Sequence, residues 1–249
     1  MRLHVLGSNG TYPSPGRPAS GYAVEHGSTV IWMDAGPGTF TALWDRFDLG
    51  SISAIIASHE HPDHCLDLLA AYHALAYGAD SHPPIPVYCP SPVVDRVRGF
   101  VRAGEGHAID TVFDFRPVEG GDEVTIGDVS VRFRRADHSV PTIASRLEAG
   151  NHVLAYSADT GTAGSWHDIA DDADLFLCEA SYQGEPGAHA YTQHLTANEA
   201  GRIARERRSR RLVLTHIPPH LDASISIDEA EATFDRPVAL AVPGAIHEL

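Results

Sequence analysis

Residues 58–64 read Ser-His-Glu-His-Pro-Asp-His and directly follow the apolar run Ile52–Ala57, a predicted strand. Four possible ligands therefore fall within six positions at a strand end: His59, His61, Asp63 and His64. Three imidazoles and a carboxylate so close together would repel when protonated and are costly to bury without partners. A divalent cation resolves the conflict, because neutral imidazole and carboxylate are good zinc ligands. The spacing predicts a metal site rather than a polar surface loop.

Alternate residues of an extended segment share a face, so we expect His59, His61 and Asp63 to converge on one ion. His64 would then point elsewhere and could serve a second ion. A two-ion site needs further ligands, and three later residues each follow a predicted apolar strand: His138, Asp159 and His216. Taken alone, each has another interpretation, as a helix cap, a turn aspartate or a satisfied histidine.

Apolar runs and turn residues predict the elements that position these side chains. The expected strands are Leu3–Leu6, Tyr22–Glu25, Thr29–Met33, Ile52–Ala57, Ile85–Tyr88, Val129–Arg135, Ala144–Glu148, His152–Ser157, Leu175–Cys178, Leu212–Thr215 and Val238–Val242. The expected helices are Thr39–Phe47, Leu66–Tyr77, Pro92–Val101, Thr196–Glu206 and Ile227–Phe234. Thr196 and Glu199 have the spacing of a capping box at the start of the fourth helix.

Strands followed by interspersed helices, with the same pattern in the second half, fit two sheets with helices outside. Possible ligands lie in both halves and no linker separates them, so residues 1–249 are interpreted as one domain. The length is sufficient for a substantial core.

The chain carries a formal net charge of −15, which disfavours nonspecific binding to nucleic acid or an anionic membrane. It does not exclude a small anionic substrate, because a metal ion dominates the field inside its site. The 3 cysteines, an odd and low number, argue against a disulfide framework and suit a reducing cytosol. Without an apparent leader or a long apolar segment, a cytoplasmic protein is expected.

The chain resembles the metallo-β-lactamase superfamily over nearly its whole length. The matching motifs are Gly7–Gly10, Met33–Gly38, His59–His64, His138, Asp159 and His216. The resemblance implies an α/β fold, an αββα four-layer sandwich of two mixed β-sheets flanked by helices, with two divalent metal ions. By resemblance, His59, His61 and His138 would hold the first ion, Asp63, His64 and His216 the second, and Asp159 both. Zinc is the expected metal, with manganese and iron as alternatives.

The second half is similar to the ribonuclease Z and class II cyclic-nucleotide phosphodiesterase branch. The similar segments are Ser157–Gly161, Cys178–Ser181, His194–Thr196 and Thr215–Pro219. There are two departures. Cys178 stands where the branch has a histidine. Only 21 positions separate His138 from Asp159 (159 − 138), which leaves no room for the arm that grips tRNA in tRNA-processing members.

The resemblance implies a hydrolase in which a hydroxide shared by two cations attacks phosphorus or a carbonyl carbon. The expected catalytic residues are Asp63, His194 and Glu179. His194 would protonate the leaving alkoxide, and Glu179 would orient His194 or raise its pKa. An exposed loop histidine is the other interpretation of His194.

We expect a small phosphodiester, such as a cyclic nucleotide, as substrate, with neither nucleic acid nor membrane as partner. A homodimer is the favoured oligomer. The alternatives are a tRNA 3′-processing endonuclease, a lactonase or thioesterase type of ester hydrolase, and a metal-binding scaffold without activity.

Several further residues have two interpretations. Asp34 could orient a metal-bound histidine or only cap the following turn. The run Arg205–Arg211 is interpreted as the solvated end of a helix rather than a phosphate site. Cys65 is assigned to core packing. Four other histidines are assigned to surface or loops: His4, His82, His107 and His247.

Overall fold

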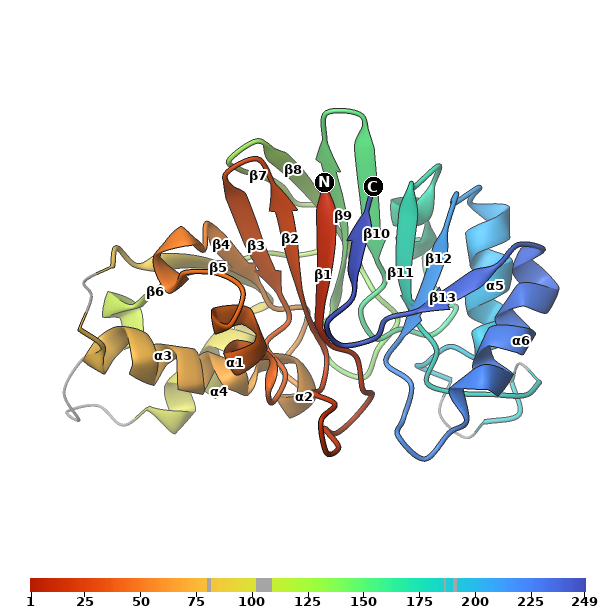
Figure 1. Cartoon of the computed structure of the whole chain (residues 1–249), viewed down its shortest axis with the longest axis horizontal. Coiled ribbons are helices and arrows are strands. Elements are labelled where there is room, and N and C mark those ends of the chain that lie inside the picture. The colour runs from red at the N-terminus through yellow and green to blue at the C-terminus, as the bar shows by residue number, and fades with distance from the viewer. Residues whose placement is uncertain (80–81, 102–108, 186, 190–191) are drawn as a thin grey trace.

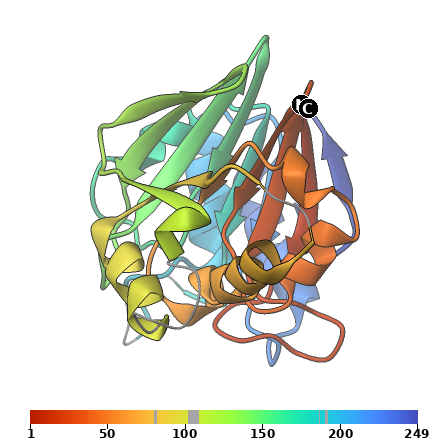
Figure 2. The same cartoon turned by 90° about the vertical axis from the view of Figure 1, so that its left-hand side faces the viewer.

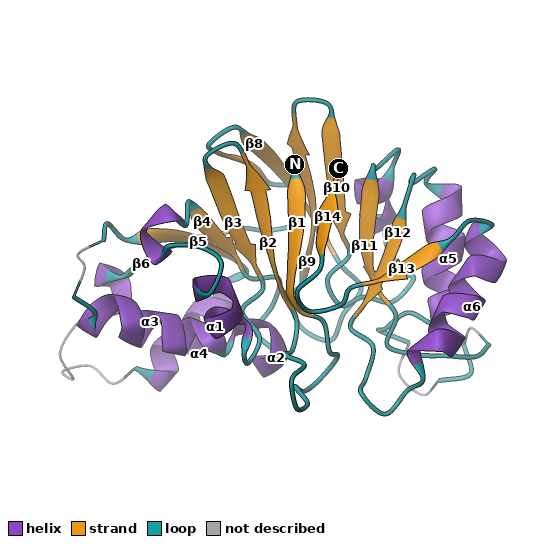
Figure 3. Ribbon diagram, viewed as in Figure 1, coloured by secondary structure: helices purple, strands orange, loops and turns teal. Residues whose placement is uncertain are grey.

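The computed structural model describes residues 1–79, 82–101, 109–185, 187–189 and 192–249 (Figure 1). His107 lies outside the described residues. Two β-sheets face each other, helices α1, α3 and α4 cover the outer face of one, and α5 and α6 cover the other (Figure 3). The predicted αββα sandwich is confirmed.

The first sheet has seven strands in the order β14-β1-β2-β3-β4-β5-β6. Their bounds are β14 Ile246–Glu248, β1 Arg2–Gly7, β2 Gly21–His26, β3 Thr29–Met33, β4 Ala54–Ile56, β5 Ile85–Cys89 and β6 Phe113–Pro117. The second sheet has seven strands in the order β13-β12-β11-β10-β9-β8-β7. Their bounds are β13 Val238–Leu240, β12 Leu212–Thr215, β11 Leu175–Glu179, β10 His152–Tyr156, β9 Ile143–Ala149, β8 Val129–Arg135 and β7 Glu123–Ile126.

The two sheets share one pairing pattern. Antiparallel pairing joins β14 through β3 in the first sheet and β7 through β10 in the second, and parallel pairing joins the remaining neighbours. The strands that precede the predicted ligands therefore end at one edge of the sandwich, the lower edge in Figure 1.

The helices are α1 Thr39–Trp44, α2 Pro62–Cys65, α3 Asp67–Tyr77, α4 Ser91–Phe100, α5 Ala197–Glu206 and α6 Ala223–Phe234. Short 3₁₀ turns lie at Leu49–Ser51, Ile109–Thr111 and Trp166–Ala170. In Figure 2 the helices of residues 39–100, orange to yellow, lie in front of the strands.

The Thr196 side chain accepts a hydrogen bond from the Glu199 amide, and the Glu199 side chain accepts one from the Thr196 amide, so the predicted capping box is confirmed. In the described part of the chain, we find no helix with the length and apolar character needed to cross a bilayer.

Three apolar layers hold the sandwich together. The inner layer lies between the sheets and contains the inward side chains of alternate strand residues, such as Val131 and Phe133 on β8. Arg132 and Arg134, between and after them, point away from this layer. The outer layers pack each sheet against its helices. Cys65 is buried in the layer beneath α1, α3 and α4, as predicted.

Three strands were not predicted: β6, β7 and β14. Strand β14 pairs with β1, which places the two termini side by side (Figures 1 and 2).

The assignment of His4 to the surface is wrong, because His4 is buried and its Nε2 lies 2.8 Å from Oε2 of Glu25. The Arg205–Arg211 run forms ion pairs with Asp171, Asp172 and Asp174, which supports its structural interpretation.

Candidate metal centre

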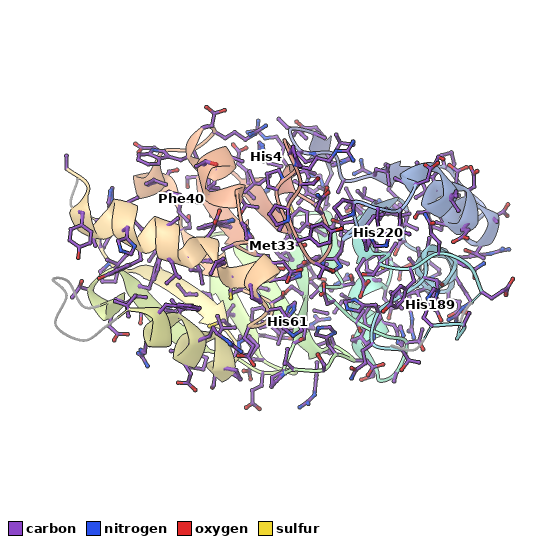
Figure 4. The ribbon with its side chains drawn as sticks, turned by 90° about the horizontal axis from the view of Figure 1, so that it is seen from below. His4, Met33, Phe40, His61, His189 and His220 are labelled. Atoms are coloured by element: carbon purple, nitrogen blue, oxygen red, sulfur yellow. The ribbon has the colours of Figure 1, made fainter. Side chains whose placement is uncertain are left out.

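The structure brings the seven predicted ligands together at the lower edge of the sandwich. Those of the first half follow β4, and those of the second half follow β8, β10 and β12. Figure 4 looks onto this edge, and His61 lies where the two halves meet. A site assembled this way exists only when the two sheets are docked.

The first donor group consists of His59, His61, His138 and Asp159. Nδ1 of His61 lies 3.0 Å from Nε2 of His59 and 3.2 Å from Nε2 of His138. Oδ2 of Asp159 lies 3.7 Å from Nε2 of His59. These donor atoms therefore face one common point.

The second donor group consists of Asp63, His64, Asp159 and His216. The Nε2 atoms of His64 and His216 lie 3.3 Å apart, and Oδ2 of Asp63 lies 3.2 Å from Nε2 of His216. Asp159 belongs to both groups, with Oδ1 at 3.3 Å from Nε2 of His64.

The expectation that Asp63 joins His59 and His61 by alternation is wrong. Pro62 begins α2, so the backbone changes from extended to helical after His61. Asp63 and His64 are consequently adjacent helical residues that both face the second group, which is the grouping that the family resemblance implies.

Protein partners hold the outer nitrogen of four histidines and leave Nε2 pointing inward. Nδ1 of His64 lies 2.8 Å from Oδ2 of Asp34, and Nδ1 of His138 lies 3.1 Å from the carbonyl of Gln193. An Nδ1–H donor in these contacts leaves a free lone pair on Nε2, the form that binds a metal. Asp34 thus orients His64, which favours the first of its two interpretations.

Two buried serines hold Nδ1 of the other two histidines, His59 and His216. Ser58 Oγ donates to Oδ2 of Asp34 and can accept from Nδ1 of His59, at 2.9 and 3.0 Å. Ser181 Oγ donates to Oε2 of Glu179 and can accept from Nδ1 of His216, at 2.6 and 2.9 Å. Each serine therefore connects a buried carboxylate to a histidine of the centre. The sequence interpretation missed both roles, since nothing local distinguishes these serines from other strand-end serines.

The electrostatics of the two groups differ. Burial lowers the pKa of His59, His61 and His138, which favours neutral imidazoles. Burial alone would also lower the pKa of His64, but Asp159, Asp63 and Asp34 raise it well above its usual value. A positive charge is thus required among these carboxylates, and a divalent cation would supply it.

The donor set fits divalent cations of the zinc type. Tetrahedral zinc with Zn–N distances of about 2.0–2.1 Å separates its donors by about 3.3 Å, close to the spacing within both groups. Imidazole-rich donors with one or two carboxylates also suit this class of ion. In addition, Oδ1 of Asp159 is buried and accepts no hydrogen bond from the residues that the structure describes. A buried carboxylate oxygen without a donor is expected where a cation binds.

The backbone around the centre is unusually constrained. Asp34, Ala158 and His216, at or near the ends of β3, β10 and β12, have left-handed conformations with φ of 56°, 51° and 55°. Gly36 packs against the ligand segment so closely that a Cβ there would lie 2.1 Å from the carbonyl oxygen of Asp63. Gly36 is therefore required because the backbone of Asp63 approaches it too closely for any side chain.

Glu179 and His194 form a pair beside the donor groups. Nδ1 of His194 lies 2.9 Å from Oε1 of Glu179, and its ring lies 5.0 Å from that of His138 and 5.7 Å from that of His216 between centroids. Burial would lower the pKa of His194, but the charge and hydrogen bond of Glu179, with a further contribution from Asp159, raise it to about 9. Glu179 therefore favours the protonated imidazole of His194, next to the predicted ligands.

Glu179, His194 and His216 form a third group with ligand spacing. The Ser181 hydroxyl lies within 3.2 Å of a side-chain atom of each of the three. A protein oxygen already occupies the common point, so this group is a hydrogen-bonded cluster rather than a third cation site.

Comparison with known proteins supports this description. The domain family described as "Beta-lactamase superfamily domain" matches residues 29–217. An uncharacterized protein of Mycobacterium leprae is 35% identical, over 100% of this chain and 89% of that protein. YhfI of Bacillus subtilis, named as a probable metallo-hydrolase, is 26% identical over all of both chains. Ribonuclease Z of Myxococcus xanthus is 25% identical over 100% and 98% of the two chains.

Solved structures share the fold. The crystal structure of YhfI, a metallo-β-lactamase fold protein, has a TM-score of 0.88 at 24% identity and covers 99% of this chain and 98% of that one. Human tRNase Z, short form, has a TM-score of 0.81 at 21% identity over 100% and 99% of the chains. A diphosphatase of the PhnP family has a TM-score of 0.79 at 16% identity over 100% and 97%.

These comparisons confirm the resemblance drawn from the sequence motifs. They give no support to the expectation that nucleic acid is not a partner, because ribonuclease Z is among the relatives. With the family's domain matched from β3 to the residue after His216, and a relative 35% identical along the whole chain, the protein belongs to the β-lactamase superfamily.

Proposed function

We propose that this protein is a metal-dependent phosphodiesterase that hydrolyses a small phosphodiester, with cyclic nucleotides as one such class. His59, His61 and His138 would hold one divalent cation, Asp63, His64 and His216 a second, and Asp159 both. When bound, two such cations activate water and stabilise negative charge on substrate oxygens. Zinc is the first candidate, followed by manganese and iron.

The observation that carries the proposal is the Glu179–His194 pair beside the donor groups. With Nδ1 bound to Glu179, His194 has Nε2 as the atom that can give a proton to a leaving oxygen. A poor leaving group such as an alkoxide needs this proton, whereas a scaffold has no use for it. Glu179 is itself fixed, because Oε1 accepts from the Thr160 amide and Oε2 from Ser181.

Two features support a small substrate. The interval between His138 and Asp159 contains the β9–β10 hairpin, whose turn is only Gly150-Asn151, so no arm extends from it. The net charge of −15 opposes long polyanions. Phosphorus chemistry is supported by relatives and neighbours named as a ribonuclease and a diphosphatase.

Hydrolysis of bis(p-nitrophenyl) phosphate, 2′,3′- and 3′,5′-cyclic nucleotides, p-nitrophenyl acetate, a homoserine lactone and a precursor tRNA should be compared with zinc or manganese present. The proposal predicts metal-dependent turnover, with a phosphodiester as the best substrate, and its loss in Asp159→Asn. Faster cleavage of the tRNA would favour a processing endonuclease, and faster cleavage of the esters a carbonyl hydrolase. Stoichiometric metal binding without turnover of any substrate would favour a scaffold.

A further inference from the structure

Two buried tyrosine hydroxyls cross the apolar space between the sheets. Tyr22 on β2 and Tyr156 on β10 belong to the inner core layer, and their rings meet edge to face with centroids 5.4 Å apart. A hydroxyl in such a core is costly unless it forms a hydrogen bond. The partners of these two hydroxyls therefore indicate why they are there.

Tyr156 reaches from the second sheet to the first. Its hydroxyl donates to Oδ2 of Asp34, 2.6 Å away, just beyond the end of β3. The same oxygen lies 2.8 Å from Nδ1 of His64. One carboxylate oxygen thus joins a strand of the second sheet to a predicted ligand of the first half.

Tyr22 reaches in the opposite direction. Its hydroxyl lies 2.5 Å from Oγ1 of Thr215, the last residue of β12. Thr215 directly precedes His216, which has the left-handed backbone conformation described above. This contact thus joins a strand of the first sheet to the residue that positions a predicted ligand of the second half.

Both phenols are kept in the hydrogen-bonding form by their surroundings. Burial raises the pKa of Tyr22 and Tyr156 above the usual value for tyrosine, and the nearby Asp34 raises both further. The two hydrogen bonds therefore persist across the physiological pH range.

We propose that Tyr22 and Tyr156 are positioning residues that set the distance between His64 and His216 across the sheet interface. The Nε2 atoms of these histidines lie 3.3 Å apart although they come from opposite sheets. Two hydrogen bonds that cross in opposite directions, each ending next to one of the pair, restrict sliding of one sheet over the other at this point. The inference rests on the proposed function, in which both histidines bind the same cation.

The test is zinc binding to the metal-stripped protein, measured for both sites by chelator competition, for wild type, Tyr22→Phe, Tyr156→Phe and the double variant. Outer hydrogen-bond partners of ligands contribute about 10–100-fold to metal affinity. We expect each single change to weaken the second site by about 10-fold and the double change to weaken it further, with a much smaller effect on the His59–His61–His138 site. Thr215→Val removes the Tyr22 contact from the other side and should reproduce the Tyr22→Phe result.

Tyr88→Phe is the matched control. Tyr88 is buried in the same core layer, but its hydroxyl accepts from Arg116 within the first sheet, 2.8 Å away. This variant should retain both affinities. A lower melting temperature of the stripped variants with unchanged affinity at both sites would overturn the inference and leave the proposed function standing. Failure of wild type to bind a second cation would instead overturn the proposed function, and the inference with it.

Discussion

Oε1 of Glu179 lies 2.9 Å from Nδ1 of His194 and holds a proton on this histidine well above the pH at which a free imidazole loses it. The pair connects β11 to the loop that precedes α5 and borders both donor groups. Its charge state controls whether His194 can act as an acid, which makes it the most direct test of the proposed mechanism.

Glu179→Gln should shift the alkaline limb of the pH profile. His194 must be protonated to donate, so activity in the wild type should fall as pH rises through about 9. Without the carboxylate, burial lowers the pKa, and the limb should move to about 6.5 or below. Profiles of kcat/KM from pH 5 to 10 measure the shift. Glu25→Gln, which removes the remote contact with His4, is the control and should leave the profile in place.

The same pair predicts how stability depends on pH. Folding raises the pKa of His194 from about 6.5 to about 9, so the pair stabilises the folded state fully below pH 6.5. That contribution is lost as pH rises through 9. The difference in melting temperature between wild type and Glu179→Gln should therefore be largest near pH 6 and fall by pH 10 to the smaller, pH-independent part that comes from the contacts of Glu179 with Thr160 and Ser181. A difference that stays constant over this range would show that the proton on His194 does not depend on Glu179.

Ser181→Ala should weaken the second cation site. The change removes the hydroxyl that lies 2.9 Å from Nδ1 of His216, so the inward direction of Nε2 is no longer enforced. A loss of about 10–100-fold in affinity is expected, measured by titration of the stripped protein. Ser209→Ala removes a buried hydroxyl that bonds the Ala170 carbonyl and precedes β12, whereas His216 follows the other end of that strand, so this variant should bind zinc like the wild type.

Removal of metal should lower the melting temperature. Ligand at about 1,000 times its dissociation constant stabilises a folded protein by about 4 kcal/mol. For a domain of this size that corresponds to about 8–16 °C. Calorimetry before and after chelation, with zinc added back, measures the effect. If chelation changes neither the metal content nor the transition, the two donor groups do not bind zinc.

Gly36→Ala should damage the centre through packing. The added methyl would lie 2.1 Å from the Asp63 carbonyl oxygen and 2.7 Å from that of Ser20, so the backbone of the ligand segment must move. Overpacking of this kind costs about 1–3 kcal/mol or more, and zinc content should fall with it. Gly99→Ala in α4 meets no atom within 4 Å and should instead stabilise the protein by about 0.5–1 kcal/mol. Equal behaviour of the two variants would contradict this explanation.

The sequence predicted what depends on short-range patterns. The histidine motif, the capping box of Thr196 and Glu199, and the alternating strand β8 are each encoded within a few residues, and all are found in the structure. Strand β14 could not be predicted in this way, because three partly exposed residues form a strand only by pairing with β1 at the other end of the chain.

Prediction of the site from the sequence was limited by the same lack of information on long-range contacts. The grouping of Asp63 depended on where α2 begins, since one proline changes the side-chain period from that of a strand to that of a helix. The contact of Tyr156 with Asp34 joins positions 122 apart, and that of Ser181 with His216 joins positions 35 apart. Such contacts follow from the docking of the two sheets, which no local pattern records.

The left-handed conformations of Asp34, Ala158 and His216 have a consequence for how the molecule opens. Each costs on the order of 1 kcal/mol for a residue with a Cβ, and all three border the donor atoms. The lower edge therefore carries backbone strain that bound cations would offset. Hydrogen–deuterium exchange of the stripped protein should begin there and spread upward, reaching the inner strands of both sheets last.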